Sequence, residues 1–284
     1  MGRGKGGFGG KSKRHANTSA IDAGLKHLES AANSSFDSGN IDNAERLYRK
    51  ILDAKPQSAS TLLKLSSICG LKNESVEQQY LLERLLSIKP DSFVACFNLG
   101  TIALQNGNEN NAVVLLERAH RLNPNDTDCR YNLALTYQIL GKTKTAINHY
   151  RELLDNGLSK PALYTNLSVC LYESGLISES LDLLEVVIDK HPHCTEALCQ
   201  LAIISEYLAD YKKAYSCLTR VIDVAPSCLP AYRRLCCLPD VDQKALYSLL
   251  KKILLRDPSL KNETEYIEAI SCLGYQECLS LLYT

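Results

Sequence analysis

The stretch VACFNLGTIALQNGNENNAVVLLERAHRLNP, from Val94 to Pro124, decides the fold because its pattern is repeated along the chain. Copies at a spacing of 34 residues read CRYNLALTYQILGKTKTAINHYRELL and then LYTNLSVCLYESGLISESLDLLEVV. In each copy an asparagine precedes a leucine and a small residue, at Asn98, Asn132 and Asn166. A fixed period of this length is the signature of a repeat architecture.

Small residues keep the same 34-residue step in both halves of the repeat. In the first half they are Ala32, Ser66, Gly100, Ala134, Ser168, Ala202 and Cys236. In the second half they are Ala44, Ala112, Ala146, Ser180 and Ala214, with Gln78 as the exception. Two helices that cross closely need small side chains at the crossing, so these positions predict the contact within a helical hairpin.

Turn residues and prolines mark the two ends of the second helix in each repeat. Turns are predicted at Gly39, Asn73, Gly107, Gly141, Gly175 and Ala209. Prolines stand at Pro56, Pro90, Pro124, Pro192 and Pro226, and the one missing from the series falls at Leu158. Proline ends a helix and starts the next unit, and hairpins that cannot bury their apolar faces alone stack into a solenoid.

This pattern resembles the tetratricopeptide repeat (TPR), a 34-residue helical hairpin with small residues at its eighth and twentieth positions. The resemblance implies an all-α, right-handed α-solenoid with six good units from residue 25 and a degenerate seventh that begins near Leu229. We expect a disordered basic, Gly-rich tail over 1–20, a TPR solenoid over 21–258, and a C-terminal capping helix or hairpin over 259–284.

Composition and missing motifs argue against an enzyme and against a nucleic-acid binder. Residues 1–16 carry five basic residues and no acid, which leaves 27 basic and 32 acidic residues in the rest. Such a near-neutral body makes nucleic acid an unlikely partner. No phosphate-binding loop or catalytic motif is present, and HPHC at residues 191–194 is interpreted as a helix stop rather than a zinc site. We therefore expect no catalytic residue, metal or cofactor.

The chain shows no apolar run of transmembrane length and no secretory signal. Its twelve cysteines fall mostly in apolar helical segments, where cysteine acts as a small buried hydrophobe. These features predict a cytoplasmic protein with free thiols and no membrane partner.

The inner face of the predicted solenoid supplies the candidate binding site. In the TPR family the first helices line the concave surface. In this sequence the sixth position of each unit, on the first helix, holds a polar residue. The row of carboxamides comprises Asn98, Asn132, Asn166 and Gln200, flanked by Lys64 and Arg234, and the aromatic wall beside it comprises Phe97, Tyr131, Tyr172 and Tyr207.

Carboxamides both donate and accept hydrogen bonds, so this row can pair with a peptide main chain. It resembles the asparagine row in the TPR region of O-GlcNAc transferase. The alternative stays open that asparagine is simply common at this position of the repeat, and that the aromatic side chains fill gaps between hairpins.

The sequence supports two classes of function. The first is a non-catalytic scaffold that binds a protein or peptide segment in the concave groove. The second is a substrate-recognition module that works with, or derives from, a TPR-linked sulfotransferase or glycosyltransferase, because YRRLCCLPDVDQKALYSLLKKIL at residues 232–254 resembles the spacer in bacterial TPR–sulfotransferase proteins. The apolar segment 259–284 also suggests homo-oligomerisation, since terminal repeats normally present a polar outer face.

Overall fold

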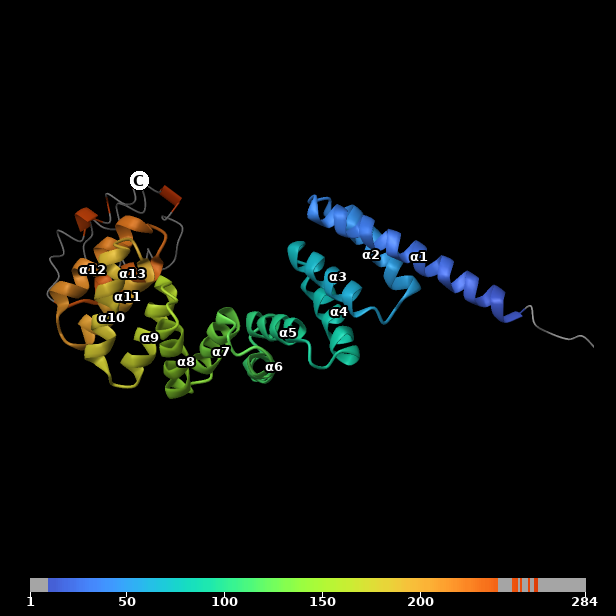
Figure 1. The fold of residues 1–284 in the computed structure, drawn as a ribbon. Helices are drawn as coiled ribbons and strands as arrows, with labels where there is room; N and C mark the ends of the chain where they lie inside the picture. The colour runs from blue at the N-terminus through green and yellow to red at the C-terminus, as the bar shows by residue number, and fades with distance from the viewer. Residues whose placement is uncertain (1–9, 240–246, 250, 252–254, 256–257, 260–284) are drawn as a thin grey trace, which may run out of the picture. The chain divides into compact units, whose positions relative to one another are not determined.

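The structure consists of stacked helical hairpins. The computed structural model describes residues 10–239, 247–249, 251, 255 and 258–259, and the elements that it defines there are α-helices (Figure 1). They form two compact units, Met1–Asn132 and Leu133–Thr284, with the boundary inside α7 (Thr127–Ile139). The predicted α-solenoid of TPR hairpins is confirmed, whereas the extent of one domain over 21–258 stays a prediction.

The first unit contains three complete hairpins. Their helices are α1 (Gly10–Asp37), α2 (Ile41–Ala54), α3 (Ala59–Leu71), α4 (Ser75–Ile88), α5 (Phe93–Gln105) and α6 (Glu109–Leu122). Within each hairpin the two helices pack on each other, and α2 and α4 each contact the first helix of the next hairpin. The helices α2, α3, α4 and α5 therefore each bury one face in their own hairpin and another in the stack.

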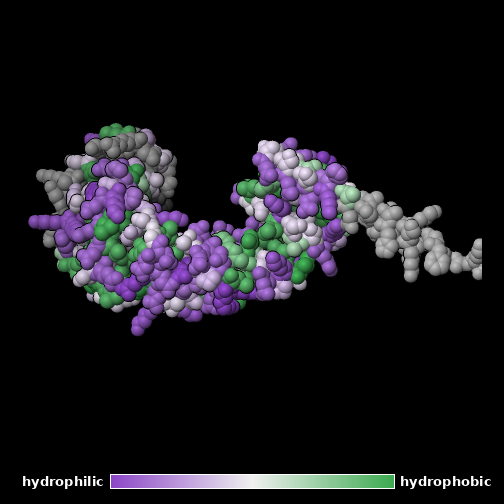
Figure 2. All heavy atoms as spheres, viewed as in Figure 1, coloured by the Kyte–Doolittle hydropathy of each residue, from purple (hydrophilic) through white to green (hydrophobic). Residues whose placement is uncertain are grey.

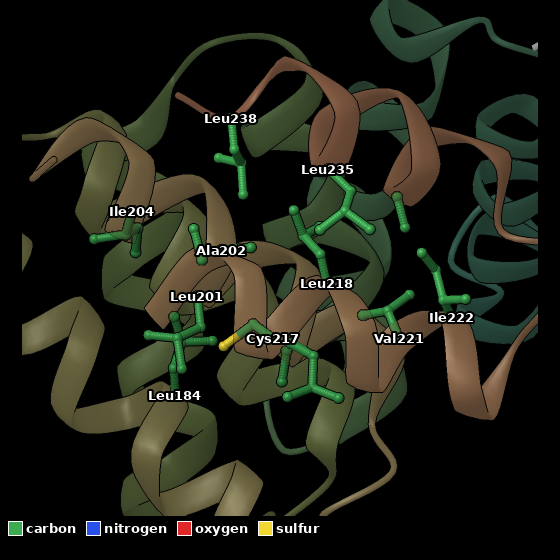
Figure 3. Close-up of a cluster of buried hydrophobic side chains, with 14 of the residues drawn as sticks. Leu184, Leu201, Ala202, Ile204, Cys217, Leu218, Val221, Ile222, Leu235 and Leu238 are labelled. Atoms are coloured by element: carbon green, nitrogen blue, oxygen red, sulfur yellow. The ribbon is translucent and has the colours of Figure 1, made fainter. Parts of the chain in front are cut away.

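The second unit continues the same order. Its helices are α8 (Thr143–Asp155), α9 (Pro161–Glu173), α10 (Ile177–Lys190), α11 (Thr195–Tyr207), α12 (Tyr211–Val224) and α13 (Leu229–Cys237). The first helices α9 and α11 also contact each other directly. Leucine, isoleucine and valine side chains from α10, α11, α12 and α13 meet in one core, with the sulfur of Cys217 among them (Figure 3).

The predicted turns are confirmed by backbone geometry. All six turn positions have positive φ, between 59° at Asn73 and 80° at Gly175. Glycine adopts this left-handed conformation freely, whereas an L-residue such as Ala209, at φ 60°, adopts it at a cost. The backbone conformation of the turns thus repeats with the same period of 34 residues as the sequence.

The predicted small residues lie at the helix crossings. Ala32, Ser66, Ala134, Ser168 and Ala202 are fully buried in the first helices, and Ala44, Ala112, Ala146, Ser180 and Ala214 are fully buried in the second helices. Gly100 is packed so closely that a Cβ there would lie 2.7 Å from Cγ of Leu116. Bulk at these positions would push the two helices of a hairpin apart.

The exception at Gln78 is explained by a glycine that the sequence analysis did not single out. A Cβ on Gly70 would lie 2.7 Å from the side-chain nitrogen of Gln78. In this hairpin the first helix therefore has a glycine, Gly70, opposite the larger side chain of Gln78 on the second helix. The hairpin closes because the combined volume, rather than one residue, is kept small.

Hydrogen bonds and ion pairs repeat between neighbouring hairpins, each joining residues 28 positions apart. Arginine side chains donate at 2.8 Å to a proline carbonyl in the preceding hairpin, in the pairs Arg84–Pro56, Arg118–Pro90 and Arg220–Pro192. Second helices are joined by the ion pairs Arg49–Glu77, Arg151–Glu179 and Lys213–Glu185. The prolines that end each unit therefore also accept contacts from the next one.

The two ends of the chain differ from the sequence-based expectation or lie outside the described residues. α1 begins at Gly10, so residues 10–20 are helical instead of belonging to a disordered tail. The segment KSKRHANTSA contains no proline, and its lysine, arginine and alanine residues favour helix. Residues 1–9 lie outside the described residues, as do residues 260–284 of the cap predicted over 259–284 and most of the second helix of the seventh unit.

Candidate functional site

The candidate site is the exposed side of the first helices, which we call the first-helix face. Each unit has a face of this kind: α3, α5 and the start of α7 belong to the face of the first unit, and the rest of α7, α9 and α11 belong to the face of the second unit. Direct contact between α9 and α11 shows that neighbouring first helices share one surface within the second unit.

Lys64 shows how a residue at the sixth position relates to the hairpin before it. Its ammonium nitrogen lies 5.1 Å from the ring centroid of Phe36, on α1. Arg234 in the second unit makes the equivalent contact, because its guanidinium donates to Glu206 of α11 at 2.8 Å. In both cases the sixth position touches the residue 28 places earlier, which is the twelfth position of the preceding unit.

Asn98 lacks this contact because its neighbour has no side chain. The residue 28 places before Asn98 is Gly70, the glycine that makes room for Gln78. The Asn98 side chain is half-buried, and its carboxamide makes no side-chain hydrogen bond with the residues that the structure describes. Its donor and acceptor are therefore available to a bound molecule.

Aromatic and polar side chains of α5 make contacts on the same helix as Asn98. The rings of Phe93 and Phe97 are stacked, with centroids 5.8 Å apart. The amide of Asn132 donates to the hydroxyl of Thr101 at 3.1 Å, and that hydroxyl donates to the Phe97 carbonyl at 3.0 Å. Asn132 is therefore held in place by α5, which fixes its orientation.

Tyr131 lies beside Asn132 and is half-buried. Burial raises the pKa of its phenol, so the side chain stays neutral over the physiological range. A neutral phenol with an apolar ring suits contact with a peptide segment.

In the second unit the structure brings Tyr172 and Tyr207 together. Their rings meet edge to face at a centroid distance of 5.7 Å. Tyr207 remains 65% exposed, and Ile139 is 53% exposed at the equivalent position two repeats earlier. Asn166 is half-buried on α9. This part of the face thus combines a carboxamide with exposed apolar surface.

Two sequence-predicted residues are less available than the amide row implied. Gln200 is only 8% exposed, because α11 packs against both α9 and α12. Arg234 is tied to Glu206 by its ion pair. We therefore keep Asn98, Asn132 and Asn166 as candidate contacts and remove Gln200, whose side chain lies inside the stack.

Two open cavities lie on the described surface, one between α11 and α13 and one at the turn before α4. One of about 330 Å³ is lined by Glu206, Pro230, Arg233, Arg234 and Cys237, at the end of the first-helix face. Another of about 560 Å³ lies at the start of α4, next to Val76 and Tyr80, which are 84% and 57% exposed. Neither is an enclosed small-molecule pocket.

One group of possible metal ligands was missed by sequence reasoning. Ligand atoms of Cys69, Glu74 and Glu77 lie within 4.8 Å of one another. Glu77 already accepts a hydrogen bond from Arg49 at 2.8 Å, and burial raises the pKa of the Cys69 thiol to about 11. Metal ligands must be deprotonated and available to the ion, whereas Glu77 is bonded to the Arg49 guanidinium and the Cys69 thiol stays protonated. The three residues therefore fit a structural contact better than a metal site. His191 is the C-cap of α10, as the interpretation of HPHC predicted.

The described surface mixes hydrophilic and hydrophobic side chains, as the view in Figure 2 shows. Among the described residues, no helix has both the length and the apolar character that a bilayer crossing requires. A large continuous apolar surface is likewise not seen on the face in Figure 2.

Two family models match parts of the chain. A family model described as Tetratrico peptide repeat matches residues 128–237, and one described as Anaphase-promoting complex, cyclosome, subunit 3 matches residues 72–153. No curated protein matches the sequence.

Solved structures that resemble the chain share its fold at low sequence identity. A repeat protein from Parabacteroides merdae is 16% identical, with a TM-score of 0.61 over 92% of this chain and 99% of that one. YrrB, described as a TPR protein with an unusual peptide-binding site, is 18% identical, with a TM-score of 0.58 over 66% and 96%. MamA is 23% identical, with a TM-score of 0.53 over 59% and 92%.

Proposed function

We propose that this chain, which has the fold of the tetratricopeptide-repeat proteins, is a non-catalytic scaffold that binds an extended segment of another protein on its first-helix face. The observation that carries the proposal is the available carboxamide of Asn98 on α5, the helix that also carries the stacked rings of Phe93 and Phe97. YrrB, a repeat protein of the same fold, is described as having a peptide-binding site.

The chemistry of the face fits a peptide main chain. A carboxamide offers one acceptor and two donor hydrogens, which match the alternating N–H and C=O groups of an extended chain. Asn98, Asn132 and Asn166 carry this group at the period of the repeat, Asn98 and Asn132 in the first unit and Asn166 in the second. Main-chain pairing of this kind supplies affinity with little dependence on the partner's sequence.

Apolar residues at the ends of the first helices would supply the selectivity. Leu71, Ile139 and Tyr207 share one repeat position and are 63%, 53% and 65% exposed. Their burial against a partner would add roughly 1.5 to 3 kcal/mol for each fully covered side chain. The proposed ligand is therefore a peptide with spaced apolar side chains.

Binding of random peptides displayed on phage tests the proposal. In the triple variant Asn98→Ala, Asn132→Ala, Asn166→Ala, the affinity for selected peptides should fall roughly 100-fold, because each lost hydrogen bond contributes about 1 kcal/mol. The matched control is Asn110→Ala with Asn148→Ala, which removes two exposed carboxamides from the second helices α6 and α8 and should leave affinity unchanged.

Asn98→Ala alone separates binding from stability. Asn132 bonds to Thr101, so its loss also weakens the stack, whereas Asn98 has no such bond among the described residues. The single variant should keep the wild-type melting temperature and lose about fivefold in affinity. Equal affinity for the triple variant, with its helical circular dichroism intact, would place the peptide site elsewhere.

The alternative function, a recognition module for a transferase, uses the same surface to present a substrate segment. It depends on the likeness of residues 232–254 to a transferase spacer, and most of that segment lies outside the described residues. The scaffold is therefore the function that the described geometry supports better.

A further inference from the structure

We propose that residues 1–9 of one chain dock on the turn between α3 and α4 of a second copy and join the two chains head to tail. The docking site, which we call the α4 turn surface, is the open cavity of about 560 Å³ in the first unit. It is lined by Asn73, Glu74, Ser75, Val76, Glu77 and Tyr80. This surface does not include the Asn98 carboxamide, so the docking is independent of the proposed peptide-binding function.

The apolar part of the α4 turn surface is exposed and held in place. Val76 and Tyr80 stand about one helical turn apart on α4 and are 84% and 57% exposed. The guanidinium of Arg84 lies 5.6 Å from the ring centroid of Tyr80 and donates at 2.8 Å to the Pro56 carbonyl of the preceding hairpin. A positioned ring beside an exposed aliphatic side chain offers a contact for an aromatic side chain.

The carboxylates beside this apolar pair outnumber the cations. Five charged side chains form one network of ion pairs, in which Lys72 and Arg49 bind Asp42, Glu45 and Glu77. Glu74 adds a fourth carboxylate, with an oxygen within 4.8 Å of one of Glu77, and it forms no ion pair among the described residues. Farther along α4, Glu83 and Arg84 carry opposite charges. The surface therefore carries an excess of two negative charges.

The sequence of residues 1–9, MGRGKGGFG, is complementary to this surface. Arg3 and Lys5 supply two positive charges, and the segment contains no acid. Phe8 supplies an aromatic side chain that fits against Val76 and Tyr80, and the glycines around it allow the backbone to approach closely. Opposite charges arranged in this way favour the encounter and fix its orientation.

The position of α1 puts the segment out of reach of its own α4 turn surface. The end of α1 leads directly into α2, and Lys72 of the α3–α4 turn contacts Asp42 at the start of α2 at 2.6 Å. Residues 1–9 precede the opposite end of α1, which continues beyond α2 (Figure 1).

The two distances differ too much for an intramolecular contact. The 28 residues of α1 span about 42 Å. A fully extended segment of nine residues spans at most about 32 Å, and Phe8 stands only two residues before the helix, a reach of about 7 Å. Phe8 therefore meets Val76 and Tyr80 on a second copy and not on its own.

Docking of this kind joins two different surfaces, so it does not close on itself in a pair. A dimer still has one unused segment and one unused α4 turn surface, and further copies can add to both. Because the contact consists of a short segment with two cations and one aromatic ring, association is weak and is screened by salt. The average mass should rise gradually with protein concentration.

Light scattering of the full chain over a range of concentrations tests the proposal. The mass should rise with concentration, and it should fall when the salt is raised from about 0.1 M to about 1 M, which shortens the screening length from about 10 Å to about 3 Å. Deletion of residues 1–9 and the variant Glu74→Lys should each give a monomer, and Phe8→Ala should weaken association about 10-fold or more. Asp53→Lys is the matched control, because it reverses an exposed charge at the other end of α2 and should associate as the wild type does.

Mixing two monomeric variants identifies the contact. The chain without residues 1–9 keeps the α4 turn surface, and Glu74→Lys keeps the segment, so the mixture should form a dimer and nothing larger. Circular dichroism should show intact helices in both variants, since Glu74 is exposed and residues 1–9 precede α1. A full chain that stays monomeric at every concentration, association that survives the deletion, or a mixture that stays monomeric would overturn the proposal.

Discussion

The second and third hairpins build the same architecture with opposite choices of residue. In the third hairpin, Gly100 of α5 packs against Leu116 of α6, and the small residue Ala112 occupies the twentieth repeat position. In the second hairpin that twentieth position holds Gln78, and Gly70 of α3 provides the space. The comparison teaches that the repeat conserves a shared volume between two helices and leaves open which helix provides it.

The two glycines also differ in what lies opposite them. Gly100 faces a leucine that is fully buried and held on all sides. Gly70 faces the end of a glutamine side chain, which can rotate into solvent. The same substitution should therefore have different consequences in the two hairpins.

The largest effect is expected for Gly100→Ala. The new Cβ would lie 2.7 Å and 2.9 Å from carbons of Leu116, so α5 and α6 must separate. Overpacking costs about 1 to 3 kcal/mol and replacing glycine in a helix returns about 1, so the free energy of unfolding should fall by up to about 2 kcal/mol in urea denaturation.

Gly70→Ala is the matched comparison and should change stability by less than about 0.5 kcal/mol, because Gln78 can move and helix propensity improves. An equal loss of stability in Gly100→Ala and Gly70→Ala would contradict the idea that Leu116 is a rigid neighbour and Gln78 a movable one. Gln78→Ala combined with Gly70→Ala should be at least as stable as Gly70→Ala alone.

A smaller effect is expected at the turns of these hairpins. Gly107→Ala, at φ 68°, should lower the free energy of unfolding by about 1 kcal/mol, because a residue with a side chain is disfavoured in the left-handed region. Asn73→Gly, at φ 59°, should gain only a few tenths, since asparagine already tolerates this conformation. Thermal melting checks both values.

Ala209→Gly extends the turn prediction to the second unit. Ala209 adopts φ 60° without asparagine's local hydrogen bonding, so the glycine variant should be more stable by up to about 1 kcal/mol. A lower melting temperature for this variant would mean that loss of the alanine side chain outweighs the relief of backbone strain.

The smallest effect concerns an ion pair that the second hairpin has and the third lacks. Lys72 donates to Glu45 at 2.7 Å, whereas the equivalent residue of the third hairpin is Asn106. The hydrogen bond from Lys72 lowers the pKa of Glu45 below its usual 4.5 despite partial burial.

Because the folded pKa of Glu45 is depressed, its contribution to stability is present above pH 4.5 and is lost as the pH falls through the folded value. The wild type should therefore exceed Lys72→Met in stability at pH 6, and the gap should narrow below pH 4.5. A gap that is the same at both pH values would show that Lys72 acts through packing alone. Asn106→Met in the third hairpin provides the control without an ion pair.

Much of the fold could be predicted from sequence because its determinants recur. Turn residues and small residues stand at a fixed period, and the structure gives all six turns a positive φ. The Gly70–Gln78 compensation was not predicted, because it joins two different repeat positions and occurs once. The helix over residues 10–20 could not be predicted from composition, because glycine and basic residues near a terminus are equally typical of a disordered tail.

The candidate site was less predictable than the fold. Counting repeat positions placed Asn98 on the first helix, but its availability depends on Gly70 in the preceding hairpin. Burial of Gln200 depends on how α11 packs, which periodicity does not encode.

The arginine contacts to proline carbonyls have a consequence for how the gene of such a protein can change length. Arg84 reaches Pro56 and Arg118 reaches Pro90, each across 28 residues. If residues 59–92 were excised, Arg118 would stand 28 residues after Pro56 and meet an identical acceptor. Loss or duplication of a whole unit in this part of the chain thus preserves the arginine–proline contacts. An insertion of any other length would break the contacts whose two residues lie on opposite sides of the inserted segment.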